Sequence, residues 1–111
     1  MDKSIKIKLL EALSDNFKNA KGKLDEFKNK LPQEYKGFVD LQMNNLKLAH
    51  SELAKDIDFY AGRPGDDSVI VKSFTIHCAE RFLPIVIMSE PEHILGYGIT
   101  YQEYLSPSKA R

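Results

Sequence analysis

Residues 10–31 read LEALSDNFKNAKGKLDEFKNKL and contain the longest regular apolar pattern in the chain. The apolar residues are spaced alternately by three and four positions: Leu10, Leu13, Phe17, Ala20, Leu24, Phe27 and Leu31. This spacing places the apolar side chains on one face of a helix, the face that packs along a second helix. The pattern keeps its phase through Ser14 and Gly22, the two positions where a helix could break. It therefore predicts one continuous helix from about Ser4 to Lys30.

A second helix is predicted from about Gln33 to Tyr60. Pro32 disfavours helical geometry at Leu31, so we expect a short turn and an antiparallel return. One apolar stripe again alternates in spacing: Val39, Met43, Leu46, His50, Leu53, Ile57 and Tyr60. Further apolar residues form a second side: Phe38, Leu41, Leu48 and Phe59. A helix that is apolar on two sides has two neighbours, which we expect to be the first helix and a sheet or another subunit.

The pattern changes after the turn-rich loop at 61–67. Residues 68–78 are rich in β-branched side chains that alternate between two faces, which predicts a β-strand. Residues 79–81 would close a hairpin and residues 82–88 would form the return strand, with Pro84 at a sheet edge or bulge. The Ser-x-x-Glu spelling at 89–92 predicts a short helical turn to about Leu95. Residues 99–105 fit either a third strand or a short helix.

These elements predict an α+β fold, in which a long antiparallel helical hairpin packs on a small antiparallel sheet of two or three strands. The chain has 111 residues, of which 42% are hydrophobic and 29% charged, as in a folded protein and not a disordered one. We expect one domain over 1–111, with the hairpin in 1–60, a β-rich part in 68–105 and a flexible tail in 106–111.

The charge balance is neutral. Sixteen basic residues offset sixteen acidic residues, whereas a dedicated nucleic-acid binder usually carries a basic excess. The single cysteine, Cys78, cannot form an internal disulfide, and the first residues lack a signal-peptide pattern, so we expect a cytoplasmic protein. The longest apolar run, 82–88, is too short to span a membrane, and no membrane association is expected.

No residue pattern predicts catalysis, a metal ion or a cofactor. His77 and Cys78 would lie on opposite faces of the predicted strand, so the imidazole would not activate the thiol. His50, His77 and His93 are too widely separated to supply the close ligand pairs of a structural zinc site. The acidic residues around the loop lack the regular spacing of a calcium loop. We therefore expect a non-enzymatic protein without a cofactor or metal.

Three groups of residues are candidate binding sites. Apolar and aromatic residues are expected to form a partner-binding surface: Phe38, Leu41, Leu48, Tyr97, Tyr101 and Tyr104. Lysines outside the apolar face of the first helix would meet nucleic acid or an acidic partner: Lys18, Lys21, Lys23, Lys28 and Lys30. A pocket between the helices and the sheet would be lined by His77, Arg81, His93 and Tyr101.

The first functional hypothesis is a protein–protein interaction module that acts by binding a partner protein. Small inhibitors, immunity-like or antitoxin-like proteins and adaptor or regulatory proteins belong to this class, including those that phages and mobile elements encode. We also expect a homodimer, because near-zero net charge does not oppose self-association. The alternatives are a dimeric nucleic-acid-associated regulator that uses the lysine face, and a small ligand-binding domain or enzyme with a pocket between helices and sheet.

Overall fold

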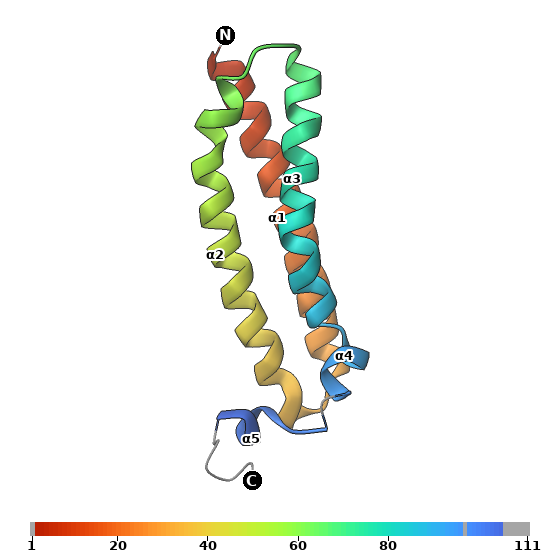
Figure 1. Ribbon diagram of the computed structural model, residues 1–111. Coiled ribbons are helices and arrows are strands. Elements are labelled where there is room, and N and C mark those ends of the chain that lie inside the picture. Colours follow the sequence, from red (N-terminus) through yellow and green to blue (C-terminus); the bar gives the residue numbers. More distant parts are fainter. Residues whose placement is uncertain (1, 97, 106–111) are drawn as a thin grey trace.

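The computed structural model describes residues 2–96 and 98–105, with side chains from residue 5 onward. Within these residues the chain forms three long helices, α1 (Asp2–Lys30), α2 (Lys36–Ala61) and α3 (Asp67–Met88). A 3₁₀ turn, η1 (Gln33–Tyr35), precedes α2, and two short helices follow α3: α4 (Pro91–Leu95) and α5 (Tyr101–Leu105). The long helices form an elongated bundle of 57 × 26 × 17 Å in which α2 runs antiparallel to α1 and α3 (Figure 1).

The predicted helical hairpin is confirmed. Helix α1 is unbroken through Ser14 and Gly22, and its buried residues include Leu13, Ala20 and Leu24. The prediction for the apolar face of α1 is wrong for Leu10, which is 52% exposed. Leu9 is buried in its place. In α2 the predicted stripe supplies the buried residues Val39, Leu46, Leu53 and Ile57, as expected for a helix that packs on a long neighbour.

The predicted sheet is wrong. The described residues contain no strand, and 68–88, which we expected to form a hairpin, lies within the continuous helix α3. The fold is therefore a helical bundle and not α+β. The second neighbour of α2 is this helix, not a sheet.

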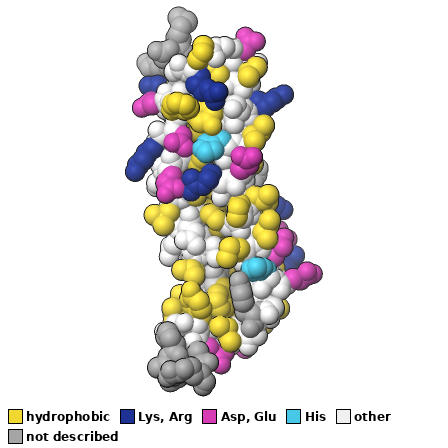
Figure 2. Space-filling view, in the orientation of Figure 1, with side chains coloured by type: hydrophobic (Ala, Val, Ile, Leu, Met, Phe, Trp, Pro, Cys, Tyr) yellow, Lys and Arg dark blue, Asp and Glu magenta, His cyan; other side chains and the backbone are white. Residues whose placement is uncertain are grey.

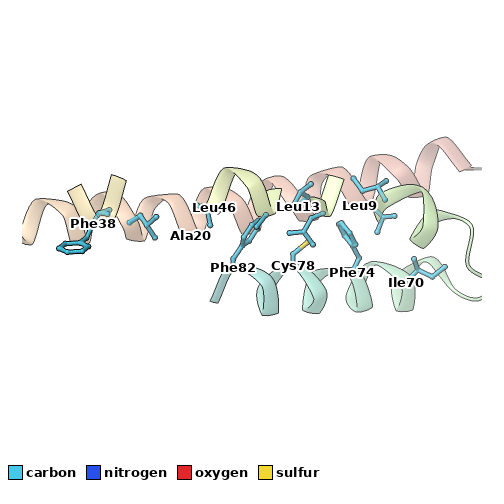
Figure 3. Packing of buried hydrophobic residues seen from close by; sticks show 14 of the residues in the cluster. Leu9, Leu13, Ala20, Phe38, Leu46, Ile70, Phe74, Cys78 and Phe82 are labelled. Atoms are coloured by element: carbon cyan, nitrogen blue, oxygen red, sulfur yellow. The ribbon is translucent and has the colours of Figure 1, made fainter. Parts of the chain in front are cut away.

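The spacing of the buried residues explains the error in α3. Ile70, Phe74 and Cys78 are each four residues apart, and positions four apart share a face both in a strand and in a helix. Phe82, which is also buried, continues the same interval of four. The residue that distinguishes the two periods is Ile76: it would share the buried face of a strand with Phe74 and Cys78, but it is 52% exposed, as a helical period requires. Figure 3 shows Phe74, Cys78 and Phe82 pointing from α3 toward the other two long helices.

Pro84 lies inside α3 without ending it. Proline has no N–H group, so the carbonyl of Glu80 loses its usual helical donor. Because Pro84 is exposed, that carbonyl group can be solvated, and the helix continues to Met88. We interpreted Pro84 as a sign of a sheet edge or bulge. In the structure it lies on the solvent side of α3, where the lost hydrogen bond does not end the helix.

The turn between α1 and α2 is held by a lysine. The Lys36 ammonium group donates hydrogen bonds to the backbone oxygens of Lys28 at 2.6 Å and Leu31 at 2.8 Å. These carbonyl groups lie at the end of α1, where helical donors run out and the helix dipole favours positive charge. Lys36 therefore ties the first turn of α2 to the last turn of α1.

The described part of the segment after α3 contains two short helices and no strand. The predicted short helical turn is confirmed as α4, but its N-cap is Glu90 and not Ser89, whose hydroxyl donates to the Ile85 oxygen at 2.7 Å. Of the two alternatives for residues 99–105, the helix is observed as α5. Tyr97 and the predicted tail at 106–111 lie outside the described residues.

Candidate functional site

An apolar pocket of about 270 Å³ lies at the end of the bundle where α2 begins and α3 ends. We call it the Phe38 pocket; its lining residues are Phe38, Leu41, Gln42, Met88, Ile94, Ile99 and Tyr104. None of these side chains carries a charge. A pocket of this composition suits an uncharged, apolar group and offers few hydrogen bonds beyond those of Gln42 and Tyr104.

One wall of the Phe38 pocket is formed by the segment that contains α5. The ring of Tyr101 packs on Gly37 and meets the Phe38 ring edge-to-face, with 5.5 Å between centroids. The Tyr104 ring lies 5.6 Å from the Phe38 ring. Aromatic pairs at these separations are favourable. They hold α5 against the first turn of α2.

Helix α5 also has a capping box that the sequence analysis overlooked. The Thr100 N–H donates to Glu103 Oε1 at 2.8 Å, and the Glu103 N–H donates to Thr100 Oγ1 at 3.2 Å. The signal was present as Thr-x-x-Glu at positions 100–103. Recognising it would have favoured the helix over the strand for 101–105. It would also have placed Tyr101 and Tyr104 on neighbouring turns of one face.

Large apolar side chains continue from the pocket along the solvent side of α2. Leu41 lines the pocket, Leu48 is 63% exposed and Phe59 is 69% exposed. We call these three residues the outer stripe of α2. Figure 2 shows hydrophobic side chains gathered over the lower half of the molecule, whereas charged and hydrophobic side chains are interspersed over its upper half. The core stripe of α2 faces α1 and α3, so the bundle leaves the outer stripe uncovered.

The predicted partner-binding residues are thus placed at one end of α2 and along its exposed side. Phe38, Leu41 and Tyr104 line the pocket, Tyr101 packs behind Phe38, and Leu48 lies on the outer stripe. Tyr97 lies outside the described residues. Three further lining residues, Met88, Ile94 and Ile99, come from segments that we had assigned to a strand, a short turn and an ambiguous element. Their shared position could not be read from the sequence.

The predicted pocket group is divided among three helices. His77 and Arg81 lie together on α3 and face α2, where His77 Nε2 is 3.0 Å from Asp56 Oδ2 and Arg81 pairs with Glu52. The His77 ring also stacks on Tyr60, with 5.6 Å between centroids. His93 lies on α4 and Tyr101 on α5. Because the described residues contain no sheet, the expected pocket between helices and sheet has no counterpart in this part of the chain.

Two side-chain contacts connect α2 to α3: His77 with Asp56, and Arg81 with Glu52. The two contacts connect residues one helical turn apart on each helix, and all four side chains are partly exposed. Partly exposed pairs contribute at most about 1 kcal/mol each. The arrangement therefore stabilises the register of the two helices modestly and leaves little free charge for a ligand.

The Cys78 thiol is fully buried beneath this cluster. Burial, and to a smaller extent the nearby negative charge of Asp56, raise the pKa of the thiol to about 11. A protonated, inaccessible thiol is a poor nucleophile. In the described part of the chain, no three His, Cys, Asp or Glu side chains are grouped so that they could hold a metal ion.

The lysine face of α1 is partly neutralised. Lys21 lies 3.4 Å from Asp25, Lys30 lies 3.2 Å from Glu26, and both carboxylates are on the same helix. Lys28 lies 2.6 Å from Asp40 of α2. Lys18 and Lys23 are exposed. Three of the five lysines thus have a carboxylate partner, which reduces the positive field that a phosphate backbone would meet.

Searches of protein-family models, curated proteins and solved structures found no match for this chain. Across the residues with a described structure, no helix is both long and apolar enough to cross a membrane. A functional assignment therefore depends on the surface of the bundle itself.

Proposed function

We propose that the protein is a non-enzymatic protein–protein interaction module whose contact surface is the outer stripe of α2 together with the Phe38 pocket. One observation carries the proposal: large, exposed apolar side chains on one helix lead into an uncharged pocket. Apolar surface of this kind next to a concave site is typical of places where proteins bind one another.

Two features support a binding role over a catalytic one. The acidic and basic side chains between α2 and α3, Asp56 with His77 and Glu52 with Arg81, pair across the two helices at a partly exposed surface. The pocket, by contrast, is lined by no carboxylate, imidazole, amine or thiol. Affinity in such a site would come mainly from burial of apolar area, at about 25 cal/mol per Å².

The test is affinity capture from the native host with three baits: the wild-type chain, Leu48→Glu and Leu83→Glu. Leu83 is a matched control, because it is 57% exposed and lies along the α1–α3 side of the bundle. We expect the wild type and Leu83→Glu to retain the same protein, and Leu48→Glu to lose it. The mass of the complex gives its stoichiometry. Retention by Leu48→Glu equal to that of the wild type would contradict the proposal.

A further inference from the structure

We infer that the surface binds a second copy of this chain, in an antiparallel arrangement in which Phe59 of each copy enters the Phe38 pocket of the other. This inference rests on the proposed function and names its partner. Helix α2 carries both halves of a self-complementary contact: the exposed ring of Phe59 near one end and the apolar Phe38 pocket at the other.

The spacing along α2 places the two halves on the same side of the helix. Leu41, in the pocket wall, and Phe59 are 18 residues apart, which is five complete turns at 3.6 residues per turn, or about 27 Å. A two-fold axis perpendicular to α2 relates each ring to the opposite pocket at the same separation. Both contacts therefore form at once, as a closed isologous dimer requires.

The pocket fits the ring in size and chemistry. An apolar cavity of about 150 Å³ already holds a benzene molecule, and the Phe38 pocket measures about 270 Å³. The entering ring would lie among apolar side chains and beside the rings of Phe38 and Tyr104, which line the pocket. Phe59 is the most exposed large apolar side chain among the described residues, at 69%, and gains most from such burial.

The residues between the two contacts have the spacing of a coiled-coil seam. Positions three and four apart continue from the pocket to the ring: Phe38, Leu41, Asn45, Leu48, Glu52, Lys55 and Phe59. Leu48 lies near the proposed axis and would contact Leu48 of the second copy or the adjacent turn of that copy's α2. The seam carries one acid and one base, and the whole chain has a formal charge of zero, so electrostatic repulsion does not oppose pairing.

The first experiment measures the mass of the purified chain by analytical ultracentrifugation over a wide range of concentration. We expect a wild-type dimer, and Phe59→Glu should raise its dissociation constant about 30-fold or more, because a charge would enter an apolar pocket. Leu83→Glu, the control on the α1–α3 side, should dimerise as the wild type does. Circular dichroism would verify that both variants remain helical.

A second experiment tests the antiparallel orientation by chemical cross-linking. Asn45 and Lys55 lie on either side of the proposed axis, so a mixture of Asn45→Cys and Lys55→Cys chains should cross-link through a short bis-maleimide. Asn45→Cys alone should cross-link poorly, since its two copies would be about 15 Å apart along the helix axes. The native Cys78 is buried and does not compete for the reagent.

Three outcomes would overturn the inference: a wild-type monomer at every concentration, a dimer that tolerates Phe59→Glu, or efficient cross-linking of Asn45→Cys alone. If the chain is monomeric but Leu48→Glu still loses a captured protein, the dimer is wrong and the proposed function stands. If Leu48→Glu weakens neither dimerisation nor the capture of any other protein, both the dimer and the proposed function are wrong.

Discussion

The ring of Tyr101 lies directly on the backbone of Gly37, at a position where any Cβ atom would collide with it. Gly37 lies in the first turn of α2, and Tyr101 begins α5, so this contact joins the start of α2 to the last described helix. The absence of a side chain at Gly37 permits the close approach, and the approach in turn builds a wall of the Phe38 pocket.

Substituting Gly37→Ala should release α5 from α2. The added methyl group would displace the Tyr101 ring, and with it the contacts between Phe38 and both tyrosines. Hydrogen exchange at residues 101–105 should accelerate, while the midpoint of thermal unfolding should change little because α5 contributes no buried residue. Unaltered exchange in α5 would show that the Gly37 contact does not hold it.

Substituting Gly22→Ala, unlike Gly37→Ala, should stabilise the protein without affecting α5. Gly22 lies within α1, has a helical conformation and has nothing within 4 Å of the place a Cβ would take. Alanine should therefore raise the free energy of unfolding by up to about 1 kcal/mol, through helix propensity alone. Urea denaturation measures this gain, and hydrogen exchange in α5 should not change.

Substituting Lys36→Met should destabilise the bundle by about 1–2 kcal/mol. The substitution removes both hydrogen bonds to the backbone oxygens of Lys28 and Leu31 and a positive charge at the end of α1. Lys47→Met is the matched control, because it removes an exposed lysine from the middle of the same helix. Urea denaturation of the two variants would compare them, and equal losses would contradict a capping role for Lys36.

The Cys78 thiol should stay protonated in the folded protein at neutral pH. Its pKa is raised to about 11 in the fold from an ordinary value of 9.0, first by burial and then by Asp56. The unfolded chain therefore loses this proton at lower pH than the folded chain, so stability should fall as pH rises from about 9 toward 11. A Cys78→Ala variant should lack this part of the decline, as pH-dependent urea denaturation would show.

Thiol labelling gives a second measurement on Cys78. A maleimide or disulfide reagent at neutral pH should react only after denaturant unfolds the bundle. Rapid labelling of the native protein would mean that the side chain is accessible, contrary to its burial among α1, α2 and α3.

Sequence reasoning was correct where the apolar pattern had a single interpretation. The alternating spacing from Leu13 to Leu31 and from Val39 to Tyr60 fits a helix and no strand, and both helices were predicted. It failed for 67–88, because the interval of four between Ile70, Phe74 and Cys78 is compatible with both periods, and β-branched residues favoured the strand. For 99–105 the two alternatives remained open, although Thr100 and Glu103 favoured the helix.

The candidate site was predictable in part for the same reason. The second apolar side of α2 was visible in the spacing of Phe38, Leu41, Leu48 and Phe59. That Met88, Ile94 and Ile99 close a pocket around Phe38 was not visible, since these residues are distant in sequence from α2 and meet it only after α3 folds back.

The sequence by itself determined two amphipathic helices, their antiparallel pairing and a surplus of apolar surface on the second, because periodicity is a local property that each segment carries alone. Only the tertiary structure decided that the third segment is a helix, which residues close the Phe38 pocket and which apolar side chains stay in solvent. Those outcomes depend on contacts between distant segments, and burial against α1 and α2 outweighed the local β preference of residues 68–78.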